Sequence, residues 1–114
     1  MKADNTKLTK EFLSERYERA RKHGYDQKAK WIEFSEYLID KGYTLYLYEA
    51  RQTFSKYITI RKHGYSPFKV RFSNHKPIQY RELNGDCDFF VGVTNLSVTT
   101  TKDAIYAVEK HFNG

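Results

Sequence analysis

The chain has 114 residues, a length that suits one domain with one hydrophobic core and is too short for two. Aromatic residues make up 17% of it, which argues against intrinsic disorder, and its single cysteine excludes an internal disulfide. No apolar run is long enough to span a membrane and no secretion signal precedes the first expected helix, so we expect a cytoplasmic protein with no membrane partner.

Positive charge is concentrated in the middle of the chain. The formal net charge is +6, and residues 43–81 hold eight Lys and Arg against one acid, Glu49, which gives that segment a net charge of +7. Residues 1–42 have ten basic and eight acidic residues, and residues 82–114 have two basic and five acidic residues. A basic stretch that is confined to one part of the sequence favours a negatively charged partner.

Two helices are expected before the basic stretch. Apolar residues recur at helical spacing over residues 8–22, and Gly24 follows as a left-handed stop. Asp26 is then expected to cap a second helix over residues 27–41, and Gly42 to end it. The broad apolar face of this second helix suits packing on a sheet.

From residue 43 onward, the apolar period changes from that of a helix to that of a strand. Lys56 is the exception, because it falls on the apolar side of its strand. Glycine and proline mark a hairpin loop over residues 62–67, and Asn84-Gly85 suits a tight turn. The expected strands are residues 43–48, 54–61, 68–73, 78–83 and 87–93, with a short extended piece over residues 96–99.

A last helix is expected over residues 102–112, where Thr100 and Asp103 form the pattern of a capping box. The expected fold class is therefore α+β, with residues 1–114 as one domain. It combines two N-terminal helices, an antiparallel sheet of four to five strands and a C-terminal helix on the same sheet face. The pattern leaves the oligomeric state open.

The candidate binding residues occupy outward positions of the central strands and the loops that follow them. Tyrosine rings stack on bases and cations neutralise phosphates, so this combination suits single-stranded nucleic acid. Tyrosine and arginine are also enriched in protein interfaces, which leaves an acidic protein surface as an alternative. A solvated sheet face, or tyrosines covered by a helix, would give the same pattern without a binding function. The candidates are Tyr46, Tyr48, Tyr57, Arg61, Lys62, Lys69, Arg71, His75 and Lys76.

The signals for catalysis are weaker than those for binding, and we expect a protein that is not an enzyme and needs no cofactor. His75, Asp86 and Asp88 are an imaginable metal site of a metal-dependent nuclease, although carboxylates beside an Asn-Gly turn are ordinary turn chemistry. Cys87 shares its strand face with apolar residues, which indicates a small buried side chain and not a nucleophile. We therefore assign no catalytic residue and no metal ligand.

One short motif occurs twice. Arg-Lys-His-Gly-Tyr stands at residues 21–25, where the first expected helix ends, and at residues 61–65, where an expected strand ends. Because glycine stops either element and basic residues suit exposed ends, the repeat can be explained without function. The alternative is a pair of similar basic-aromatic loops that grip one anionic surface.

The segment Lys-Val-Arg-Phe-Ser-Asn-His-Lys at residues 69–76, preceded by Lys-Tyr-Ile-Thr-Ile at residues 56–60, resembles a pattern of small phage and mobile-element proteins. Asn74 stands where that pattern has Asp. Small Tyr-rich proteins of this setting look like anti-CRISPR and other anti-defence inhibitors, which act by binding. The resemblance implies an inhibitor that occupies an acidic or nucleic-acid-binding surface of a host complex directed at nucleic acid. The alternatives are a direct DNA- or RNA-binding module and the metal-dependent nuclease.

Overall fold

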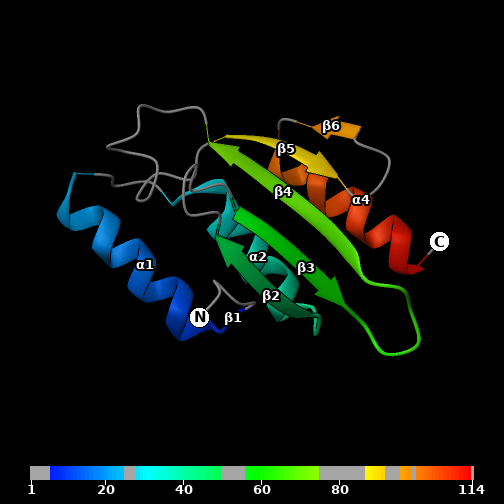
Figure 1. Cartoon of the computed structure of the whole chain (residues 1–114). Coiled ribbons are helices and arrows are strands. Elements are labelled where there is room, and N and C mark those ends of the chain that lie inside the picture. The colour runs from blue at the N-terminus through cyan, green and yellow to red at the C-terminus, as the bar shows by residue number, and fades with distance from the viewer. Residues whose placement is uncertain are drawn as a thin grey trace.

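The computed structural model of the chain places helices against one antiparallel sheet (Figure 1). The structure describes residues 6–24, 28–49, 56–74, 87–91, 96–98 and 100–113. The described helices are α1 (Lys10–Lys22), α2 (Lys30–Asp40) and α4 (Thr101–Asn113). Two helices, then a sheet, then a helix is the expected α+β fold class, which is confirmed. None of these described helices is long and apolar enough to cross a membrane.

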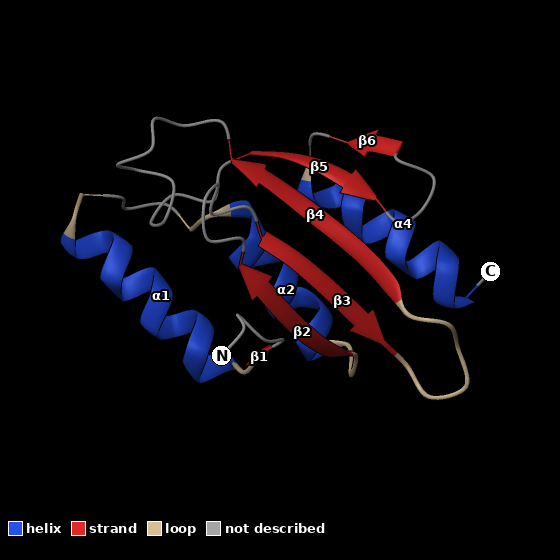
Figure 2. Cartoon of the chain, viewed as in Figure 1, coloured by secondary structure: helices blue, strands red, loops and turns tan. Residues whose placement is uncertain are grey.

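The sheet follows the chain order without a crossover. Its strands lie in the order β1-β2-β3-β4-β5-β6, and each neighbouring pair is antiparallel (Figure 2). The outermost described strands are short, which limits pairing with other chains at the edges of the sheet. The strands are β1 (Thr6–Lys7), β2 (Thr44–Glu49), β3 (Lys56–Arg61), β4 (Phe68–Asn74), β5 (Cys87–Val91) and β6 (Leu96–Val98).

Local hydrogen bonds set several helix boundaries. Thr9 precedes α1, and its hydroxyl oxygen accepts from the backbone N–H three residues on, at 3.1 Å. At the start of α4, the hydroxyl oxygen of Thr100 accepts from the N–H of Asp103 at 3.0 Å, so this expected cap is confirmed. Gly24 and Gly42 have φ angles of 94° and 95°, a left-handed conformation that glycine adopts without strain. Both glycines follow a helix, as expected.

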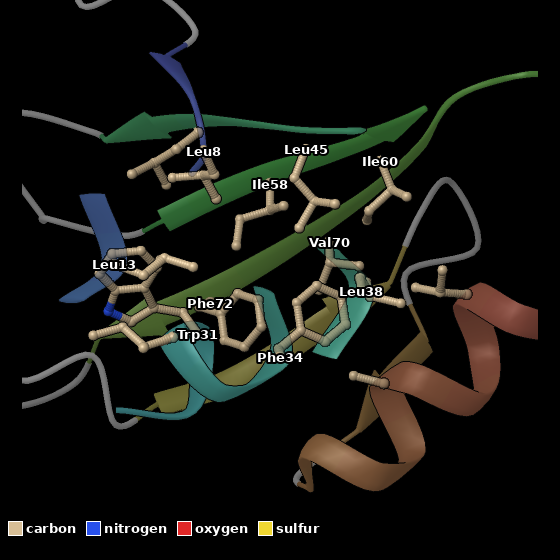
Figure 3. Packing of buried hydrophobic residues seen from close by; sticks show 14 of the residues in the cluster. Leu8, Leu13, Trp31, Phe34, Leu38, Leu45, Ile58, Ile60, Val70 and Phe72 are labelled. Carbon is tan, nitrogen blue, oxygen red and sulfur yellow. The ribbon is translucent and has the colours of Figure 1, made fainter. Parts of the chain in front are cut away.

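The core lies between the sheet and helices α2 and α4, which are behind the sheet in Figure 1. Phe34 of α2 packs edge-on against Phe72 of β4, with ring centroids 5.2 Å apart, near the centre of the cluster in Figure 3. The sheet contributes Leu45, Leu47, Ile58, Ile60, Val70 and Phe72, and α2 and α4 contribute Trp31, Phe34, Leu38, Ala104, Val108 and Phe112. All of these side chains are at most 2% exposed.

The start of the chain differs from the sequence expectation. The first helix begins two residues later than expected, because the N–H of Leu8 donates to the carbonyl of Leu45 at 2.9 Å and continues the pairing of β1 with β2. The second helix begins at Lys30 and not at residue 27, and its N-cap residue Ala29 makes no side-chain cap. The expected cap, Asp26, lies outside the described residues.

One expected strand and one expected turn also lie outside the described residues. These are residues 78–83 and the Asn84-Gly85 pair. Within the described sheet, β4 pairs directly with β5, in a register that places Val70 opposite Val91. The strands expected over residues 68–73 and 87–93 are therefore neighbours.

Candidate binding surface on the outer face of the sheet

One face of the sheet is turned away from α2 and α4 and is built from the strand residues that do not enter the core. In β3, Tyr57 and Thr59 are half-buried and alternate with the fully buried Lys56, Ile58 and Ile60. This alternation follows from the strand period, since consecutive side chains point to opposite faces. We call this surface the outer face, and its residues with described side chains, all in β1 to β4, are Lys7, Thr44, Tyr46, Tyr48, Tyr57, Thr59, Arg61, Lys69 and Arg71.

The strand register arranges the outer face in rows across the sheet. Tyr48 of β2 lies opposite Tyr57 of β3, and Tyr57 lies opposite Arg71 of β4. The two tyrosine rings are tilted by 55° with centroids 5.9 Å apart, and the guanidinium carbon of Arg71 lies 5.6 Å from the Tyr57 centroid. This row is therefore a continuous Tyr-Tyr-Arg contact over three strands.

The neighbouring row has a cation at each end. Lys7 of β1 lies opposite Tyr46 of β2. On its other side, Tyr46 lies opposite Thr59, which in turn lies opposite Lys69 of β4. Arg61 extends the outer face along β3 toward the β3–β4 loop. The tyrosines therefore occupy the middle of the described outer face, and the cations surround them.

The most accessible groups of the outer face are one ring and three cations. Tyr48 is 39% exposed, whereas the other two tyrosines are half-buried. Lys7, Arg61 and Lys69 are exposed, and no acid in the described part of the chain forms an ion pair with them. Cations without an acidic neighbour raise the positive potential of the surface that carries them. A partner that approaches this face meets positive charge and an aromatic ring first.

The single acid of the basic stretch lies on the other side of the sheet. Glu49 accepts hydrogen bonds from the Arg16 guanidinium at 2.7 and 2.9 Å, and its carboxylate lies 2.9 Å from the Nζ of Lys56. Lys56 is only 1% exposed, and its Nζ lies 5.6 Å from the Trp31 ring centroid. Burial raises the pKa of Glu49, but the hydrogen bonds and charges of Arg16 and Lys56 outweigh burial and lower that pKa from 4.5 to about 2.

This inner ion cluster of Arg16, Glu49 and Lys56 explains why Lys56 breaks the apolar pattern, and sequence reasoning missed it. The strand register places Glu49 directly opposite Lys56, and Arg16 reaches the same carboxylate from α1, 33 positions earlier in the chain. The sequence did contain a signal for the pair of Lys56 and Glu49. A lysine on the apolar face of a strand needs an acidic partner, and Glu49 is the only acid in the basic stretch. The cluster joins α1 to the end of β2 and belongs to the fold.

Lys62 lies in the β3–β4 loop and not on the outer face. Its Nζ lies 5.7 Å from the ring centroid of Tyr43 and 5.2 Å from that of Tyr65. The loop is also held to α4, since the ring Nε2 of His111 donates to the carbonyl of Ser66 at 2.9 Å. The structure therefore separates Lys62 from the other described candidates.

Several expected site residues lie outside the described part of the chain. These are the binding candidates His75 and Lys76, together with Asp86 of the imagined metal site. Asp88 and Cys87 are described only through their backbone, as part of β5. Among the described residues, no three His, Cys, Asp or Glu side chains lie close enough to hold a metal ion. The metal-site hypothesis thus stays a prediction from the sequence.

The described residues of the two copies of the repeated motif, 21–24 and 61–65, lie at opposite ends of the molecule in Figure 1. Gly24 follows α1, and Gly64 lies in the β3–β4 loop. Both have positive φ angles, 94° and 84°, which allow the chain to reverse without strain. This separation favours the explanation in which each glycine ends an element, over one in which the two loops grip a common surface.

Comparison with known proteins adds no relative, because no family model, curated protein or solved structure matches the chain. The outer face is the feature of the described structure that suggests a function. In strands β1 to β4, its described side chains combine three tyrosine rings with four cations. The register of β5 puts Asp88 at a position of the same face, opposite Ser73.

Proposed function

We propose that this chain is a non-enzymatic binding protein whose outer face engages a negatively charged partner. The observation that carries the proposal is the contact row of Tyr48, Tyr57 and Arg71, with exposed cations beside it. Tyrosine rings offer a large contact area and lose little conformational entropy when they bind. Tyrosine and arginine are also the residue types that carry much of the binding energy in protein interfaces.

The charge of the outer face limits the kind of partner. Its four described cations, Lys7, Arg61, Lys69 and Arg71, would repel a basic surface. A nucleic-acid-binding site on another protein is itself basic, which makes it a poor match for this face. An acidic protein surface and nucleic acid itself are the two matching classes.

The resemblance to phage and mobile-element proteins supplies a biological setting for this binding. In that setting the protein would inhibit a host defence complex directed at nucleic acid, as anti-CRISPR-like inhibitors do. It would act by occupying either an acidic surface of the complex or the nucleic acid that the complex needs. Neither route requires the protein to cleave a bond.

Binding to a small panel of anionic polymers tests the proposal. The panel holds a single-stranded oligonucleotide, the corresponding duplex and polyglutamate, each labelled for fluorescence anisotropy. At least one of them should bind, and the double variant Arg61→Ala/Lys69→Ala should lose about tenfold or more in affinity for it.

The matched control removes two exposed cations from helices, as Lys22→Ala/Lys110→Ala. Because the change in net charge is the same, this control should alter the affinity by no more than about twofold. The proposal is wrong if no polymer binds at low salt, or if the two double variants lose affinity equally.

A further inference from the structure

The spacing of the outer-face rings distinguishes between forms of nucleic acid. Tyr46 and Tyr48 are alternate residues of β2, so their Cα atoms lie about 7 Å apart along the strand. Bases that stay stacked in a helix are only about 3.4 Å apart, and their faces are covered by their neighbours. Two rings at the wider spacing can therefore meet only bases that have separated from each other, which is how single strands are recognised.

The rings and cations of the outer face occupy a patch of the size that a short single strand covers. From β1 to β4 this patch spans three inter-strand spacings, or about 14 Å, and it spans about 14 Å along the strands between Arg61 and Tyr57. A sheet face with a few aromatic rings suffices for about two or three bases.

The positions of the cations fit a single strand as well. Within β1 to β4 the rings lie in the middle, with Lys7 on the β1 side, Lys69 on the β4 side and Arg61 at the end of β3. A strand whose bases lie on the rings brings its phosphates to these flanks, where long cationic side chains reach them. Lys7 and Lys69 give up no ion pair with a described residue when they do so.

We infer that the outer face binds single-stranded nucleic acid, with two or three bases stacked on its tyrosines and the phosphates on its flanking cations. This inference rests on the proposed function and narrows its anionic partner to one chemical class. DNA and RNA share the chemistry in question, so the test includes one probe of each kind.

Replacement of the most exposed ring tests the stacking. The probes are labelled oligothymidylate and oligouridylate of about ten nucleotides and a DNA duplex of similar length. Tyr48→Leu should weaken binding of at least one single strand about fivefold or more, because each base-ring stack contributes at least that much. Duplex binding should be unchanged within about twofold, since paired bases are not free to stack on the ring.

The chain offers a closely matched control for that variant. Tyr37 of α2 is 38% exposed, compared with 39% for Tyr48, but it lies on the helical side of the molecule. Tyr37→Leu should leave single-strand affinity within about twofold of the unmodified chain, and Tyr48→Phe, which keeps the ring, should do the same. Equal losses for Tyr48→Leu and Tyr37→Leu would overturn the inference, as would a Tyr48→Leu protein that binds single strands normally.

Salt dependence tests the phosphate contacts separately. With Lys7, Arg61 and Lys69 on phosphates, the logarithm of the single-strand association constant should fall with the logarithm of salt concentration with a slope of about −2. In Arg61→Ala/Lys69→Ala the slope should shrink to about −0.7, and in Lys22→Ala/Lys110→Ala it should stay near about −2. A slope that both double variants reduce equally contradicts the arrangement.

The failure of this inference differs from the failure of the proposed function. If polyglutamate binds through Arg61 and Lys69 while neither single strand binds, the binding function stands and the nucleic-acid inference is wrong. If the duplex binds as tightly as the single strands and loses as much with Tyr48→Leu, the inference is also wrong. If nothing on the panel binds, both are wrong.

Discussion

The two faces of the sheet handle positive charge in different ways, although the same three strands form both. On the inner face of β2, β3 and β4, Lys56 is the one described cation, and the carboxylate of Glu49 lies 2.9 Å from it. On the outer face, Arg61 and Lys69 are exposed and no described acid pairs with them. A charge that is buried during folding needs an ion-pair partner within the chain. A charge at the surface is hydrated instead, and it stays available to a partner from outside.

The comparison also shows that the +7 of residues 43–81 is not one surface. Lys56 belongs to the inner ion cluster and Lys62 to the aromatic contacts of the β3–β4 loop. Of the described cations of that stretch, the outer face keeps Arg61, Lys69 and Arg71, and it gains Lys7 from β1. Lys56 and Lys62 therefore add no charge to the surface that a partner of the outer face meets.

The largest expected difference between the faces is in packing. Phe72→Ala removes a fully buried ring that contacts Phe34, and it should lower the free energy of unfolding by about 3 to 5 kcal/mol. Lys69→Ala, on the outer face of the same strand, should change it by less than about 0.5 kcal/mol. Urea denaturation followed by tryptophan fluorescence measures both. Similar costs for the two variants would mean that the outer face is packed like the inner one.

The next effect concerns the acid that two cations share. Glu49→Gln leaves Lys56 buried beside a neutral amide and should destabilise the protein by about 3 kcal/mol. Lys56→Met should cost about 1 kcal/mol or less, because Glu49 keeps both of its hydrogen bonds from Arg16. Denaturant unfolding of the two variants at neutral pH gives the comparison. If Lys56→Met is the more damaging change, the cluster depends on the lysine and not on the carboxylate.

Acid should weaken the inner face through the same carboxylate. The pKa of Glu49 falls from 4.5 to about 2 on folding, so its contribution to stability is complete above about pH 4.5 and is lost as the pH falls toward about 2. That contribution is about 3 kcal/mol, from a pKa difference of about 2.5 at about 1.4 kcal/mol for each unit. In Glu49→Gln the same pH range should show a smaller loss of stability. Other carboxylates also titrate there, so the difference between the two proteins, measured by unfolding at a series of pH values, is the informative quantity.

The sequence predicts the features of this fold that arise from local patterns. The change in apolar period at residue 43, the glycines after α1 and α2, and the cap at Thr100 each depend on neighbouring residues, and the structure confirms them. The pairing of Thr6–Lys7 with β2 has no local signature, because two residues are too short to show a period. The predicted start of α2, at residue 27, was also wrong, because the N-cap residue Ala29 has no side-chain cap that a sequence pattern could reveal.

The candidate site shows the same division between local and long-range information. Alternation within each strand predicts which tyrosines and cations share a face. The strand register, which the sequence does not reveal, shows which of these residues are in contact, for example Tyr57 and Arg71. Lys62 could not be separated from this group by sequence, because its place depends on Tyr65, beyond the end of the strand. Arg16 was missed for a similar reason, since only folding brings α1 to Glu49.

A small expected effect on stability accompanies the largest expected effect on binding. Arg61→Glu/Lys69→Glu lowers the net charge from +6 to +2, since each reversal removes two positive charges. The residues opposite these positions, Thr44 and Thr59, are uncharged, so a glutamate at either site meets no like charge across the strands. The free energy of unfolding should therefore stay within about 1 kcal/mol of the unmodified protein, while binding to the anionic panel is lost. A double reversal that unfolds the protein would show that the two cations serve the fold, as Lys56 does, and would remove the contrast between the faces.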